Sequence, residues 1–182
     1  MLKNIIAIGL FTMIANGALA ANSKYELVFN GETPLSLQIA SVSVVPSKSV
    51  AAETKVYDER DVTKMQEVLQ NKVLSRLQQN GLLADEGLRL EFIITDLKPN
   101  RPTMAQYRTK PGLSGESIAL GGASIEGNLI DAAGNSIATI NFVWEENWIG
   151  QVPSSTTWYD ARRAFSILAR KLARDLASNP AS

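Results

Sequence analysis

The side chains best suited to chemistry in this chain are carboxylates that lie beside aromatic rings. Glu145 and Glu146 are adjacent, and Trp144 and Trp148 flank them. A glycosidase uses two carboxyl groups that face each other across a sugar bond. Neighbouring residues on a strand point to opposite faces of the sheet, so these two acids do not face each other. Solvated acids at the end of a strand are therefore the favoured interpretation.

The chain contains two other acidic pairs. Glu126 and Asp131 would be partners only if folding brought them close. Asp85 and Glu86 are adjacent acids in a plain loop, which lacks the alternating ligand positions of a calcium loop. A carboxylate-dependent hydrolase therefore remains an alternative, but the sequence assigns no catalytic residue.

The chain has no histidine and no cysteine. This excludes a Ser-His-Asp triad, a cysteine nucleophile, a conventional zinc site and haem held by histidine or cysteine. Gly121 and Gly122 are followed neither by Gly-Lys nor by a helix, so they do not predict a phosphate cradle. The sequence predicts no metal site and no cofactor.

Basic residues give the best indication of binding. The predicted last helix carries Arg163, Arg170, Lys171 and Arg174 opposite its apolar stripe, with Ile167 among them. Such a face fits an anionic partner, which could be a lipid headgroup, an envelope polymer or an acidic protein. The alternative is a solvated helix face whose cations favour the negative C-terminal end of the helix dipole.

The segment 101–115 could extend this basic surface through Arg101, Arg108 and Lys110. It contains two prolines and two glycines and has no period, so a functional or mobile loop is predicted. If this loop protruded in an ordered form, it would favour another alternative, a secreted inhibitor that plugs an enzyme with residues 99–115.

Alternating apolar and polar residues predict the strands. They occupy residues 35–44, 88–95, 123–129 and 138–144. The first run slips in phase near Ala40, which indicates a bulge, and Pro46 ends it. A loop is expected at 47–54, and no element is assigned to 25–31. The last two runs predict an antiparallel hairpin through 131–135, in which Gly134 and Asn135 could take positive φ.

Spacings of three and four apolar residues predict two main helices. The first begins near Asp58 and Asp61 and ends at Asn80-Gly81. The second begins at Thr156 or Thr157, with Asp160 at capping-box spacing. Their apolar stripes are Val62, Met65, Leu69, Val73 and Leu77, and then Trp158, Ala161, Phe165, Leu168, Leu172 and Leu176. We therefore predict an α+β fold, a mostly antiparallel sheet with two main amphipathic helices packed on it.

Residues 1–20 have the pattern of a signal peptide. Lys3 precedes an apolar run at 5–14, and Ala18 and Ala20 are small residues at the cleavage positions. The run is shorter than the roughly 20 residues of a membrane span. We therefore expect residues 21–182 to form one exported α/β domain, located in the periplasm or outside the cell, with no transmembrane span. Removing Lys3 leaves 17 basic and 18 acidic residues, a balance that argues against a general nucleic-acid binder.

Three segments carry a resemblance to a known family. They are GGASIEGNLIDAAGN at 121–135, TTWYDARRAFSILARKLARDL at 156–176, and the helix of 64–83 before an alternating strand. Together they resemble an uncharacterised family of bacterial envelope proteins, a domain-of-unknown-function family (number 3313 in that series). The resemblance implies a small α/β domain and no catalytic residues. Members are usually lipoproteins, but this chain has no cysteine after its signal, so no membrane anchor is carried over.

These observations favour a non-catalytic, soluble binding or assembly accessory protein of the cell envelope. An anionic envelope component or a protein is the expected partner. The secreted inhibitor and the carboxylate-dependent hydrolase are the alternatives.

Overall fold

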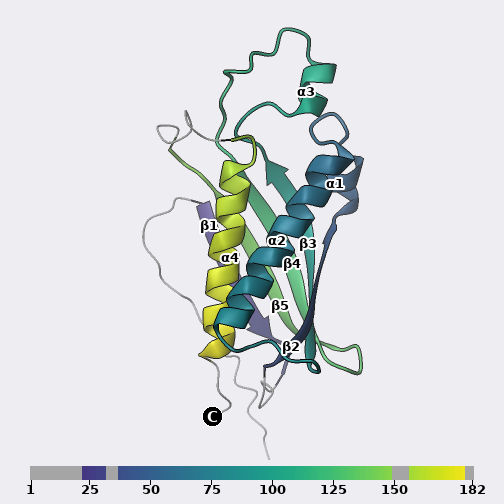
Figure 1. Ribbon diagram of the computed structural model, residues 1–182, viewed down its shortest axis with the longest axis vertical. Helices are drawn as coiled ribbons and strands as arrows, with labels where there is room; N and C mark the ends of the chain where they lie inside the picture. The colour runs from purple at the N-terminus through teal and green to yellow at the C-terminus, as the bar shows by residue number, and fades with distance from the viewer. Residues whose placement is uncertain (1–21, 32–36, 149–155, 179–182) are drawn as a thin grey trace, which may run out of the picture.

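The computed structural model describes residues 22–31, 37–148 and 156–178 (Figure 1). The expected signal peptide at 1–20 lies outside the described residues. The described elements are β1 (Asn22–Phe29), β2 (Ile39–Pro46), α1 (Lys48–Ala52), α2 (Glu59–Gln79), β3 (Leu88–Lys98), α3 (Met104–Thr109), β4 (Gly122–Ile130), β5 (Ser136–Glu145) and α4 (Tyr159–Ala177).

The five strands form one sheet in the order β1-β5-β4-β3-β2. β2 and β3 are parallel and are joined through α2, whereas the other neighbouring pairs are antiparallel. α2 and α4 lie side by side on one face of the sheet (Figure 1). The predicted α+β fold, with a mostly antiparallel sheet and two main helices, is confirmed.

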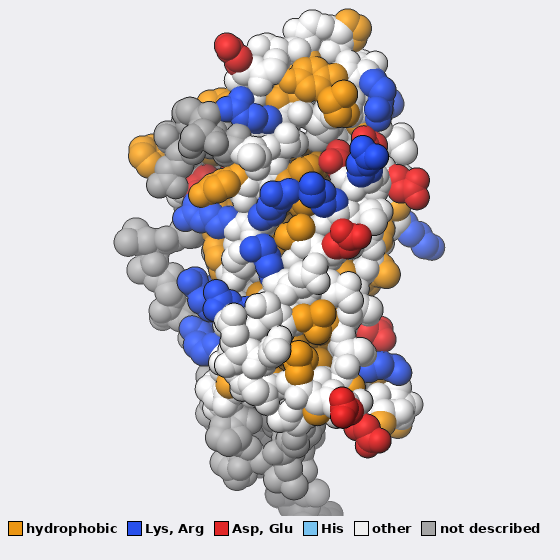
Figure 2. Space-filling model, viewed as in Figure 1, with side chains coloured by type: hydrophobic (Ala, Val, Ile, Leu, Met, Phe, Trp, Pro, Cys, Tyr) orange, Lys and Arg blue, Asp and Glu red, His pale blue; other side chains and the backbone are white. Residues whose placement is uncertain are grey.

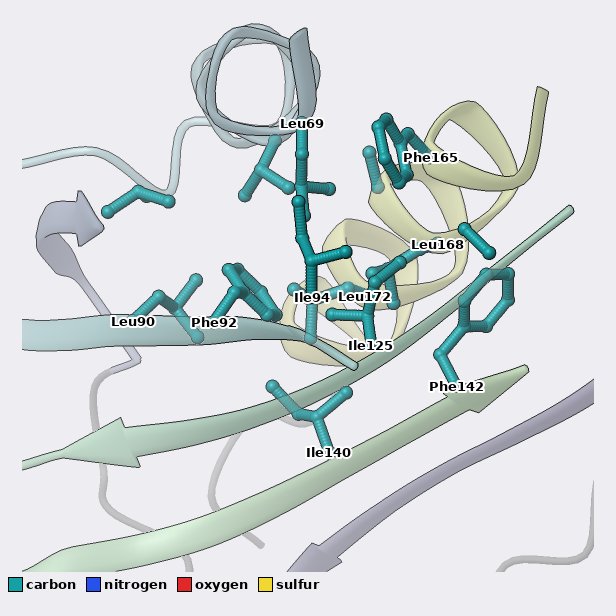
Figure 3. Close-up of a cluster of buried hydrophobic side chains, with 14 of the residues drawn as sticks. Leu69, Leu90, Phe92, Ile94, Ile125, Ile140, Phe142, Phe165, Leu168 and Leu172 are labelled. Atoms are coloured by element: carbon teal, nitrogen blue, oxygen red, sulfur yellow. The ribbon is translucent and has the colours of Figure 1, made fainter. Parts of the chain in front are cut away.

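Both predicted helical stripes form the core. Every residue of the two stripes is buried, and the strands contribute side chains from the same face of the sheet. Figure 3 shows Phe92, Ile125 and Phe142 pointing from the strands toward Leu69 of α2 and Phe165 of α4. Burial of this apolar surface is the main force that holds the helices on the sheet.

The predicted bulge and the predicted ends of α2 are also confirmed. The β2–β3 register shifts between Ile39 and Ser41, around Ala40, and β2 ends at Pro46. Asp58 caps α2 by accepting a hydrogen bond from the Asp61 backbone N–H at 3.0 Å. Beyond the other end of α2, Gly81 has a φ of 66°.

Two segments predicted as loops contain short helices. Residues 47–54 include α1, whose first turn is capped by the Ser47 hydroxyl. Residues 101–115 include α3, which begins with a capping box formed by Thr103 and Gln106. Each helix is too short to show an apolar period. The capping residues Ser47 and Thr103 were the sequence signals that could have predicted them.

The β4–β5 hairpin turns at Gly134, which has a φ of 89°. Replacing Gly134 with valine should lower the free energy of unfolding by about 1–3 kcal/mol, because a β-branched residue resists positive φ. Gly134→Asn should cost less, because asparagine tolerates this region. Denaturant melts of both variants test the turn, and an unchanged midpoint for the valine variant would contradict it.

Side chains of α2 cover the outer edge of β2. The Ser47 N–H donates to Ile94 of β3, so the alternate residues Val42 and Val44 direct their carbonyls away from β3. Gln70 donates to the Val42 carbonyl at 2.7 Å, and Gln66 donates to the Val44 carbonyl at 2.8 Å. These bonds block the carbonyl groups that another strand would need for pairing at this edge.

Candidate surface for an anionic partner

Two of the predicted basic residues of α4 lie over aromatic rings of β5 and β1. Arg163 stacks over the Trp144 ring at 5.1 Å, and Lys171 lies over the Tyr25 ring at 5.5 Å. Figure 2 shows lysine and arginine side chains gathered over the helical layer and along its margin. We call the row Arg163, Arg170, Lys171 and Arg174 the α4 basic face.

Two cations of the α4 basic face have acidic partners. Arg163 donates to Glu146 at 2.6 Å, and Arg174 donates to the neighbouring Asp175 at 2.8 Å. Arg170 is exposed. The face therefore keeps a positive excess, centred on Arg170 and Lys171.

Burial and charge alter two groups at this face. Burial, followed by the Asp175 carboxylate, raises the pKa of Tyr25 well above its usual range, so its hydroxyl stays protonated. Burial and then Arg174 lower the pKa of Lys171, with Asp175 opposing the shift. Lys171 is therefore a cation held against an aromatic ring, and a negative partner would offset part of the electrostatic cost of its desolvation.

Ile167 lies among these cations on α4, four residues after Arg163 and four before Lys171. It is partly buried and packs against the core. Its predicted role in partner binding stays a prediction, because its side chain is half-buried like that of Lys171.

The structure separates the three predicted basic residues of the 101–115 segment. The residue before Arg101 is Asn100, whose backbone N–H donates to the Thr157 carbonyl just before α4. The Arg101 guanidinium donates to the Gly115 carbonyl. Arg108 lies 3.7 Å from Asp58 at the start of α2. Lys110 follows α3 and is exposed. Arg108 and Lys110 therefore belong to the α3 end of the loop, and only Arg101 lies near α4.

A buried polar cluster anchors this loop, and the sequence did not reveal it. Asp160 is 2% exposed and Asn100 is fully buried. Asp160 accepts hydrogen bonds from the Asn100 amide and from the Gly121 N–H, while its own N–H donates to the Asn100 Oδ1 at 2.8 Å. We call Asn100, Gly121 and Asp160 the loop anchor. It joins the end of β3, the start of β4 and the first turn of α4.

The loop anchor explains two features of the sequence. A Cβ on Gly121 would lie 2.7 Å from the Asn100 Oδ1, so this glycine is required by close packing. The predicted capping box of Thr157 and Asp160 is wrong, because Trp158 occupies the N-cap and makes no side-chain cap bond. The Asp160 carboxylate is used by the loop anchor instead.

The acids proposed for a hydrolase are engaged elsewhere. Glu145 pairs with Lys98, and Glu146 pairs with Arg163. Glu126 lies inside β4 opposite Asn141, whereas Asp131 bonds Asn135 in the hairpin turn. Five residues of extended chain separate them by about 16 Å, more than the roughly 6.5–9.5 Å of an inverting pair. Within the described ranges, no acidic group of three or more could hold a metal ion.

Sequence reasoning also missed a polar contact between the two main helices. The Lys72 ammonium of α2 donates to the Ser166 hydroxyl of α4 at 2.7 Å. Ser166 in turn donates to the Arg162 carbonyl. Arg162 and Ser166 are polar residues four positions apart, and this spacing could have predicted a second polar row on α4.

Because of Tyr57, the free energy of unfolding should depend on pH in the alkaline range. Its hydroxyl donates to the Leu97 carbonyl at 2.6 Å, and burial, with help from Asp96, raises its pKa to about 12. A raised folded-state pKa contributes stability that is complete below the unfolded value of about 10 and is lost as pH rises toward the folded value. Denaturant midpoints should therefore fall between about pH 10 and pH 12. The fall should be smaller in Tyr57→Phe, and equal slopes in both proteins would contradict the assignment.

No family model matches the sequence, and no curated protein matches it. Membership in family 3313 therefore stays a prediction. Among solved structures, the chain is similar to a PelC dodecamer from Paraburkholderia phytofirmans, with 11% identity over 86% of this chain and 98% of that chain and a TM-score of 0.47.

It is also similar to a minor lipoprotein from Acinetobacter baumannii, with 17% identity over 77% of this chain and 94% of that chain and a TM-score of 0.38. Rare lipoprotein B from Shewanella oneidensis is 15% identical over 77% of this chain and 89% of that chain, with a TM-score of 0.23. None of these similarities transfers a function to this chain. In the part of the chain that the structure describes, no helix is long and apolar enough to cross a membrane.

Proposed function

We propose that this chain is a non-catalytic binding or assembly accessory protein of the bacterial cell envelope, and that its α4 basic face recognises an anionic partner. The observation that carries the proposal is the row of four cations on one side of α4, two of which have acidic partners among the described residues. Exposed cations attract anionic ligands over about 10 Å at roughly 0.1 M salt.

The proposal is tested by salt-dependent binding to three anionic probes. The probes are polyglutamate, phosphatidylglycerol vesicles and alginate. Arg170→Gln combined with Lys171→Gln should weaken binding to the preferred probe, because it removes the two cations of the face that have no ion pair with a described residue. The matched control is Arg60→Gln with Lys64→Gln, which removes two exposed cations of α2. Equal losses in the two double variants, or no binding by the unmodified protein, would reject the proposal.

Arg163 is a poor choice for that test. Arg163→Glu would place a carboxylate beside Glu146 and would remove the cation from the Trp144 ring. The variant should therefore lose stability as well as charge, and a binding defect could not be assigned to the surface.

A second candidate function follows from the loop. Residues 99–121 project beyond the sheet at one end of the molecule and contain α3 (Figure 1). The loop anchor and the hydrogen bond from Thr103 to the Val56 carbonyl hold it, and Met104 is 62% exposed. An ordered protruding loop is what an enzyme inhibitor would present. Inhibition of a secreted hydrolase, abolished by Met104→Glu, would support this second candidate.

A further inference from the structure

β1 is an edge strand of the sheet as far as the described residues show. Asn30 lies opposite Ile137 in the β1–β5 register, and its N–H donates to the Ile137 carbonyl at 2.9 Å. Hydrogen-bonded pairs alternate along an antiparallel ladder, so the even-numbered residues of β1 bond to β5. The N–H and C=O groups of Ser23, Tyr25, Leu27 and Phe29 therefore point outward. Among the described residues, no further strand pairs with them.

The side chains beside this edge form an incompletely covered surface. Tyr25, Leu27 and Phe29 lie on the helical side of the sheet and are only half-buried, although they pack against the core. Lys171 of the α4 basic face lies directly over Tyr25. An added strand would thus meet the outward backbone groups of β1 on one side and the Lys171 ammonium near its side chains.

We propose that the β1 edge binds an extended acidic peptide segment of a partner protein as a sixth strand. The outward backbone groups would supply the ladder, and acidic side chains at every second position would meet the α4 basic face. Pairing of this kind takes affinity from main-chain bonds and specificity from alternate side chains. The inference rests on the proposed function and names the chemical class of its partner.

The charges argue against a second copy of this chain at the same edge. Edge-to-edge pairing about a two-fold axis at Tyr25 would bring the two α4 basic faces toward each other. Like charges that face each other without compensation oppose association. An acidic segment instead complements Lys171, the cation that lies over the β1 edge.

The probe is a capped peptide of about eight residues, the length of an ordinary strand, with glutamate and threonine alternating. We expect binding to slow hydrogen exchange at the outward amides of Tyr25, Leu27 and Phe29, measured by NMR. A peptide of the same composition with paired glutamates should bind more weakly, because its acids lie on both faces. A version N-methylated at alternate residues, so that it cannot donate to the edge, should lose binding by about tenfold or more.

Variants test the same edge from the side of the protein. Leu27→Pro removes one outward N–H, which an edge strand tolerates, and should weaken binding by about tenfold. Leu27→Ala keeps this N–H and serves as the matched control, with a loss of no more than about threefold. If Leu27→Pro does not fold, the N-methylated peptide gives the same information with the unmodified protein.

Three outcomes would overturn the inference. The first is equal binding of the N-methylated and unmodified peptides. The second is protection of the β1 amides that depends on protein concentration without peptide, which indicates a second copy. The third is a result in which vesicles or peptide bind and the binding requires Arg170 and Lys171, but the β1 amides stay unprotected. This third result would retain the proposed anionic surface, whereas equal losses in the α2 and α4 charge variants would remove the proposed function itself.

Discussion

Phe165→Ala should lower the free energy of unfolding by about 3–5 kcal/mol. Phe165 is fully buried on α4 and lies between the helical layer and the sheet (Figure 3). Its truncation removes apolar burial and leaves a cavity, and the loss is a large part of a typical domain stability of about 5–15 kcal/mol.

The matched control for Phe165→Ala is Tyr159→Ala on the same helix, where the side chain is 46% exposed. That change should cost no more than about 1 kcal/mol. Urea melts monitored by tryptophan fluorescence measure both variants. Similar midpoints for the two would show that the assigned face of α4 is wrong.

Asp160→Ala should cost about 3 kcal/mol, because it leaves the buried Gly121 N–H without an acceptor and removes a charged acceptor from Asn100. Asp175→Ala is the control, since it removes an acid of the same helix whose partner is the exposed Arg174. Surface pairs of this kind contribute up to about 1 kcal/mol.

The effect of Asp160→Ala should also be local. Because the loop anchor ties the start of α4 to both ends of the 101–121 segment, hydrogen exchange should accelerate first at Ala119 and Gly121. Uniform acceleration over the whole sheet, without an additional effect in this segment, would contradict the anchoring role.

The elements with a regular period could be predicted from the sequence. Burial selects apolar residues every 3.6 positions on α2 and α4 and every second position on β4 and β5, so the stripe of Val62 and Leu69 and the row of Ile125 and Leu129 were visible. The parallel pairing of β2 and β3 was not predicted, although a strand, a helix and a strand in succession carry that signal.

The contacts of the candidate site had no comparable signal. Asn100 and Asp160 are 60 positions apart, and Glu146 and Arg163 are 17 apart. Neither spacing belongs to a local period, because each pair meets only after the sheet and α4 have packed. The sequence therefore identified the cations of α4, but it did not show which of them are neutralised.

The glutamines at the β2 edge have a consequence for stoichiometry. Gln66 and Gln70 occupy outward carbonyls of β2 with side chains of the same molecule. A sheet that accepts new strands at both edges can add further molecules without limit. A sheet with a single accessible edge can accept only one added strand. Any assembly built on strand addition to this protein would therefore end as a one-to-one complex instead of a growing fibre.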